Sequence, residues 1–148
     1  SADYDTRANL MWTASMALNG LIGAGVPQDW STHLIGHELT ALHGIDHART
    51  LAIVLPANLQ VRRQEKREKL LQYAIVEGGE EQRMGAAIAR TRTFFEQLGL
   101  PTRLSDYHLG ATDIEIIITQ LESHNLTQLG EHKNVSLEIS RQILETSL

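Results

Sequence analysis

The sequence contains no cysteine, which excludes a disulfide framework and any metal site built from thiolates. A metal ion would have to be held by histidine and carboxylate side chains. Positive charge is also scarce: because the formal net charge is −5, we expect neither nucleic acid nor a membrane surface as a partner. No apolar run approaches the roughly 20 residues that span a bilayer, and residues 1–5 are too polar to begin a signal peptide. We therefore expect a cytoplasmic protein.

The composition fits one folded domain over residues 1–148. A hydrophobic fraction of 42% is enough for a core, and a charged fraction of 21% is too low for an intrinsically disordered chain. The apolar residues recur at helical spacing nearly throughout, which predicts an all-α fold. The predicted helices cover residues 5–22, 27–43, 46–55, 61–76, 80–98, 111–123 and 134–144.

Several boundaries rest on particular residues. Asp29 adds negative charge near the start of helix 27–43, and Gly44 is placed to end it. Asp46 is a candidate cap for the next helix, which Pro56 should bend or interrupt. The segment 111–123 would serve as a strand as readily as a helix, and its helical surroundings favour the helix.

Two further stretches need an interpretation. Asn134 is the expected cap of the last helix, and residues 101–110 are expected to form a loop. The run VRRQEKREK, residues 61–69, carries five basic and two acidic side chains. Because the protein as a whole is acidic, we interpret this run as a solvated helix face and not as a nucleic-acid patch.

Four of the seven histidines lie within fifteen positions, at His33, His37, His43 and His47. Four residues of helix correspond to about 400° of rotation and roughly 6 Å of rise, so the first two share one helix face. His43 lies about 240° further round and is a poor ligand candidate. His47 follows the break at Gly44, where the returning chain could bring its ring towards His33.

The residues alone leave the role of these histidines open. The segment HLIGH lacks the glutamate of an H-E-x-x-H zinc motif, because Glu38 follows the second histidine. One alternative is a self-contained histidine-metal hydrolase, whose third ligand and general base would have to come from Glu38, Asp46 or His108. Another is a helical interaction module in which the histidines are incidental and no metal binds.

A longer stretch carries a resemblance. Residues 25–56 read GVPQDWSTHLIGHELTALHGIDHARTLAIVLP. This resembles the metal-binding segment of the iron-containing alcohol dehydrogenase family, with H-x-x-x-H, a small residue, and a third histidine before an aliphatic run ending in Leu-Pro. The context MALNGLIGAGVPQDW, KREKLLQYA and FFEQLGLPTRLSDY is similar to its bacterial NADPH-dependent aldehyde reductase and butanol dehydrogenase branch. One departure is Asp46-His47-Ala48, where much of the family has Pro-His-Gly.

The resemblance implies a role for three histidines. His33 and His47 match two metal ligands of the family, and the ion would be zinc or ferrous iron. His37 matches an unligated histidine that faces the cleft, which makes it our candidate catalytic residue on the proton route. Trp30, one turn before His33, could line the same cleft.

The resemblance also implies missing parts. Family members are more than twice this length and carry an N-terminal α/β nucleotide-binding domain, which supplies an aspartate and a histidine to the metal. The glycines of NGLIGAG, residues 19–25, follow a predicted helix and not a strand, so they are no dinucleotide fingerprint. We therefore expect the C-terminal helical domain of a two-domain dehydrogenase. Its implied cofactors are NADPH and a divalent metal, its substrate is a small aldehyde or alcohol, and the intact enzyme is expected to form a homodimer.

Overall fold

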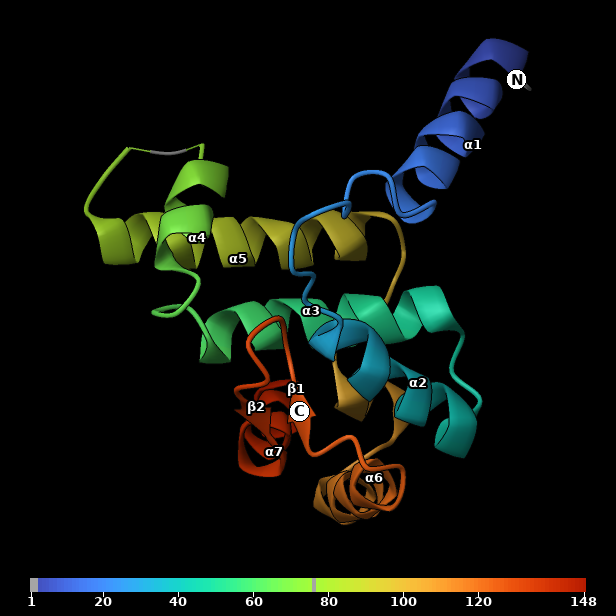
Figure 1. The fold of residues 1–148 in the computed structure, drawn as a ribbon, viewed down its shortest axis with the longest axis vertical. Coiled ribbons are helices and arrows are strands. Elements are labelled where there is room, and N and C mark those ends of the chain that lie inside the picture. Colours follow the sequence, from blue (N-terminus) through green and yellow to red (C-terminus); the bar gives the residue numbers. More distant parts are fainter. Residues whose placement is uncertain (1–2, 76) are drawn as a thin grey trace.

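The computed structural model describes residues 3–75 and 77–148, and within these ranges its regular structure is almost entirely helical (Figure 1). The all-α prediction is therefore confirmed. The elements in chain order are α1 (Tyr4–Leu18), α2 (Ser31–His43), α3 (His47–Val61), α4 (Arg67–Tyr73), α5 (Glu80–Gln97), the 3-10 helix η1 (Leu104–Tyr107), α6 (Ala111–Ser123), β1 (Gln128–Leu129), β2 (Val135–Ser136) and α7 (Leu137–Thr146). No helix in the described ranges is long and apolar enough to cross a membrane.

Helix α3 lies at the centre of the molecule, between α2, α6 and α7 on one side and the α4–α5 pair on the other (Figure 1). Its apolar run explains this position, because Ile53 and Val54 are completely buried. Fully burying one such side chain contributes roughly 1.5–3 kcal/mol. The main core also contains Ile35, Leu39, Ile114, Ile117, Leu121, Ile143 and Leu144. A smaller cluster of Leu70, Met84 and Ile88 joins α4 to α5.

Helix α1 projects away from this body (Figure 1), and none of its residues is buried. Its start is defined locally, because the Asp3 carboxylate accepts hydrogen bonds from the backbone N–H groups of Asp5 and Thr6. The prediction placed its end at residue 22, whereas the helix ends at Leu18. Gly20 follows with φ of 87°, a left-handed conformation that stops a helix.

The first turn of α2 differs from the prediction. The helix begins at Ser31 and not near residue 27. The Asp29 carboxylate accepts from both the backbone N–H and the hydroxyl of Ser31, which holds residues 29–31 in a turn ahead of the helix. The end is as predicted, with Gly44 at φ 66°.

Helix α3 begins as predicted but does not break at Pro56. Asp46 occupies the N-cap position, although its side chain makes no capping hydrogen bond. The sequence predicted a bend or an interruption at Pro56; the residue lies inside the helix and is buried, so the helix is not interrupted there. Proline removes one helical hydrogen bond, and the buried neighbours Ile53 and Ala57 give packing that offsets the loss.

The predicted helix 61–76 is not one helix. Helix α3 continues to Val61, a turn follows, and α4 spans Arg67–Tyr73. Val76, the predicted end, lies outside the described residues. The interpretation of residues 61–69 as a solvated face is also wrong at Arg62, which is only 4% exposed. Ion pairs with Asp29, Glu65 and Glu131 hold it inside.

The C-terminal region follows the prediction more closely. Residues 80–98 and 111–123 were predicted as helices and correspond to α5 and α6. Residues 101–110 contain η1. Ser136, and not Asn134, caps α7, because its hydroxyl accepts from the Ile139 N–H. The cap lies two residues later than predicted since Val135 and Ser136 pair with Leu129 and Gln128 in an antiparallel ribbon.

Candidate metal centre

Three of the clustered histidines meet where α2 and the start of α3 come together. The ring centroids of His33 and His37, on α2, are 6.5 Å apart. His47, the first residue of α3, has its centroid 5.4 Å from that of His33 and 4.9 Å from that of His37. The fold thus brings His47 next to His33 and His37, although the break at Gly44 separates His47 from the other two in sequence.

A glycine permits this approach of the two helices. A Cβ atom added to Gly36 would lie 2.7 Å from the Thr50 hydroxyl oxygen and 3.3 Å from its Cβ. Both residues are buried at the crossing of α2 and α3. Any larger side chain at Gly36 would push α3 away from α2 within one turn of His37 and His47.

The surroundings of His33 favour its neutral form. Burial lowers the pKa of its imidazole, and the two neighbouring histidines, His47 and His37, lower it further. The Trp30 ring packs edge-on against it, with 4.9 Å between centroids. Because metals bind the deprotonated nitrogen of a neutral imidazole, this environment suits a ligand. Trp30 is 40% exposed, so part of its side chain faces solvent.

The donor chemistry fits a divalent ion but is incomplete. Imidazole nitrogens are good ligands for zinc and ferrous iron. Among residues 3–75 and 77–148, however, no group of three or more histidine, cysteine, aspartate or glutamate side chains is arranged to hold a metal ion by itself. Structural and catalytic zinc sites use three or four protein ligands, so a metal ion held at this cluster would need further donors.

The other candidate residues form no metal-binding group with the three histidines in the described structure. Glu38 is buried, and its carboxylate pairs with Nδ1 of His124 at 2.8 Å. The Asp46 side chain is 82% exposed and pairs with Arg49. His108 is the left-handed residue that ends η1. Nε2 of His43 is buried without a hydrogen-bond partner in the described structure. None of them completes a metal-binding group there, so the hydrolase alternative gains no third ligand.

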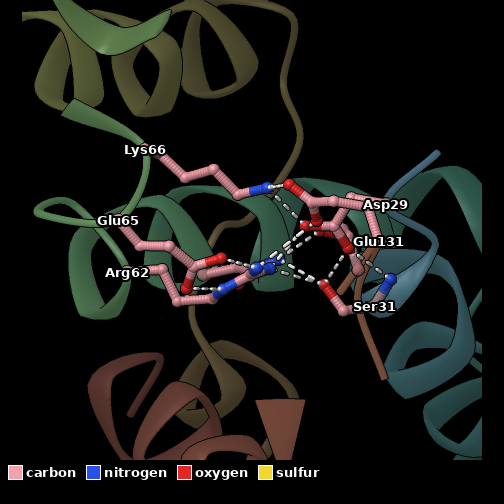
Figure 2. A network of polar contacts seen from close by, with 8 residues as sticks. Asp29, Ser31, Arg62, Glu65, Lys66 and Glu131 are labelled. Carbon is pink, nitrogen blue, oxygen red and sulfur yellow. Dashed lines mark hydrogen bonds and ion pairs between the residues drawn. The ribbon is translucent and has the colours of Figure 1, made fainter. Parts of the chain in front are cut away.

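Sequence reasoning missed a charged network just before α2 (Figure 2). The Arg62 guanidinium, 2% exposed, pairs with Asp29, Glu65 and Glu131, and Lys66 pairs with Asp29 and Glu131. Three of these five charged residues lie in the run 61–69, and Asp29 lies just before α2. No local sequence pattern indicates that they pair with one another. The signal that could have been noticed is an arginine placed directly after the apolar stretch of α3.

The network shifts the pKa of its members in the expected directions. Burial raises the pKa of the Asp29 carboxyl, but hydrogen bonds from Ser31, Lys66 and Arg62 together hold it well below its usual range. The hydrogen bond from Arg62 lowers the pKa of Glu65. Burial alone would lower the pKa of Arg62, whereas its bonds to Glu65 and Asp29 raise it. All three groups are therefore charged at neutral pH.

Residues 1–147 match the profile of the Fe-containing alcohol dehydrogenase family, C-terminal. The chain belongs to this family. It is 59% identical over 150 residues to the NADPH-dependent aldehyde reductase YqhD of Escherichia coli and 32% identical over 152 residues to the NADH-dependent butanol dehydrogenase A of Clostridium acetobutylicum. Each alignment covers 98% of this chain and 39% of the relative, so the chain spans about two fifths of their length.

Solved structures of family members agree with this assignment. The substrate- and cofactor-free form of the Escherichia coli aldehyde reductase YqhD superposes with a TM-score of 0.96 at 58% identity, over 99% of this chain and 40% of that one. The NADH-dependent butanol dehydrogenase A of Thermotoga maritima gives 0.89 at 29% identity, over 98% and 39%. The resemblance to the aldehyde reductase and butanol dehydrogenase branch is confirmed.

Proposed function

We propose that residues 1–148 form the metal-binding helical domain of an NADPH-dependent alcohol dehydrogenase or aldehyde reductase. The observation that carries this proposal is the meeting of His33, His37 and His47 in a member of this family. The substrate would be a small aldehyde or its alcohol. The incomplete donor set supports a site shared with another part of a longer enzyme more than a site complete in this chain.

In this proposal two of the histidines bind the metal ion and the third transfers a proton. His33 and His47 would hold the divalent ion, zinc or ferrous iron, through their ring nitrogens. A bound ion of this kind supplies Lewis acidity towards the aldehyde oxygen. His37 is exposed on the same face, so its ring can take up or give a proton at the substrate side of the cluster.

The remaining parts would come from an N-terminal nucleotide-binding domain. Such a domain would bind NADPH and present its nicotinamide to the aldehyde carbon. It would also supply the missing ligands, and the intact enzyme would be a homodimer in the cytoplasm. The 39% coverage of the relatives supports this division.

The test is metal retention measured beside turnover in the full-length enzyme. His33→Ala and His47→Ala should each empty the site, because each removes one of few ligands. His37→Ala should keep the ion and lose kcat, since a proton relay acts only in turnover. Metal analysis of the three purified variants decides between the roles. An empty site in His37→Ala together with a filled one in His47→Ala would reverse the assignment.

A further inference from the structure

The first turn of α2 is held from outside the helix. Trp30 occupies the N-cap position but makes no side-chain capping hydrogen bond. Instead, the Asn58 amide of α3 donates to the hydroxyls of Ser31 and Thr32, both at 2.9 Å. Asn58 is 5% exposed, so these bonds form in a water-poor setting where their loss is costly. The start of α2 is thus tied to the C-terminal half of α3.

Arg62, one helical turn after Asn58, also binds the start of α2. Its guanidinium donates to the Ser31 hydroxyl at 3.3 Å and to the Asp29 carboxylate (Figure 2). The Asp29 carboxylate in turn accepts from the Ser31 N–H and hydroxyl at 2.9 and 2.6 Å. Arg62 therefore holds both the loop before α2 and the first residue of the helix.

A planar fork of donors is needed at this position. Three carboxylates, those of Asp29, Glu65 and Glu131, surround the Arg62 guanidinium from different segments of the chain. Lys66 contacts two of them, with Nζ 2.9 Å from the Asp29 carboxylate. A lysine at position 62 would keep the charge, but a compact ammonium cannot reach all three carboxylates in fixed directions. We therefore expect the substitution to weaken first the contacts that hold the loop carrying Asp29.

This attachment bears directly on the histidine cluster. His33 follows Thr32 in the first turn of α2, and the ring of Trp30 packs on it. Because α3 carries Arg62 at its end and His47 at its start, bonds between α3 and the start of α2 fix the two histidines relative to each other. We propose that Arg62 is a positioning residue for the metal centre. This inference rests on the proposed function of His33 and His47 as ligands.

The experiment uses the full-length enzyme loaded with Co²⁺, whose visible absorption reports ligand geometry. The variants are Arg62→Lys and Asp29→Asn. The matched control is Arg63→Lys, because Arg63 is the next residue, is half-exposed, and pairs with Glu81 at the surface. Affinity for Co²⁺ is measured by competition with a chelator, and the absorption spectrum of the loaded protein is recorded for each variant.

Arg62→Lys should lower Co²⁺ affinity by about 10-fold, the lower end of what losing an outer support of a metal ligand typically costs. Its Co²⁺ absorption bands should shift as well. Asp29→Asn should move both readouts in the same direction by less. Arg63→Lys should stay within about twofold of the wild type, since exposed ion pairs contribute little.

The spectrum separates positioning from stability. A purely structural role would lower the free energy of unfolding and leave the Co²⁺ spectrum of the folded protein unchanged. The inference is therefore overturned if folded Arg62→Lys matches Arg63→Lys in affinity and spectrum. Should Arg62→Lys not fold, Asp29→Asn decides on the same readouts. If His33→Ala and His47→Ala keep the metal, the proposed function fails, and this inference with it.

Discussion

Helices α1 and α3 each contain fifteen residues and a similar supply of large apolar side chains. Yet no residue of α1 is buried, whereas α3 contributes Ala52, Ile53, Val54 and Ala57 to the core at zero exposure. Leu10, Met11 and Trp12 of α1 are each at least 66% exposed. The comparison shows that an apolar helical pattern specifies a helix, while burial depends on which other segments are present to cover it.

The largest expected effect lies in α3. Ile53→Ala should lower the free energy of unfolding of this chain by about 2–5 kcal/mol, because it removes buried methyl groups and leaves a cavity. Ile53 is completely buried in the main core. Urea unfolding followed by circular dichroism measures the change. A loss below 1 kcal/mol would mean that α3 is not the centre of the core.

A second prediction concerns the crossing that brings α3 to α2. Gly36→Ala should lower the free energy of unfolding by about 1–3 kcal/mol, because the added methyl overlaps the Thr50 side chain. The matched control is Gly85→Ala in α5, where nothing lies within 4 Å of the added Cβ. In that control the free energy of unfolding should rise by up to about 1 kcal/mol, because alanine has a higher helix propensity than glycine. Equal effects at both sites would contradict a close approach at Gly36.

A third prediction concerns the network that joins the end of α3 to the start of α2. Asp29→Asn should lower the free energy of unfolding by about 1–2 kcal/mol at pH 7, since it weakens bonds to charged partners. The pKa of Asp29 is lower in the folded protein than in the unfolded chain. Its stabilisation is therefore present above the unfolded pKa of about 3.9 and disappears as the pH falls through the folded pKa.

The measurement for this third prediction is unfolding by urea at several pH values. The difference between wild type and Asp29→Asn should shrink as the pH falls below about 4. Glu65→Gln should show the same trend, because the pKa of Glu65 is lowered too. A difference that stays constant with pH would show that Asp29 acts through packing and not through its charge.

The smallest expected effect lies in α1. Leu10→Ala should change the free energy of unfolding by less than about 0.5 kcal/mol, because exposed substitutions away from special contacts usually do. The same urea experiment compares it directly with Ile53→Ala. In an enzyme whose N-terminal domain covers α1, the loss of unfolding free energy caused by Leu10→Ala should be larger.

Sedimentation of this chain should also show self-association through the exposed apolar side chains of α1, and Leu10→Ser should weaken it.

The sequence by itself determined the helical class of the fold and pointed to the histidines of the candidate site. Apolar spacing predicted the all-α fold, and Gly44 ends its helix as expected because it adopts a positive φ. The i, i+4 spacing of His33 and His37 and the helix start at His47 follow from local rules as well. The histidines therefore could be named before the fold was known, although their roles remain predictions.

Only the tertiary structure decided how long-range partners reshape these local patterns. Pro56 stays inside α3, where the core packs around it, and directly after the end of this helix Arg62 pairs with the carboxylates of Asp29 and Glu131. Those partners lie 33 and 69 residues away in sequence. A local pattern records the preferences of neighbouring residues, whereas ion pairing and burial depend on segments that only folding brings together.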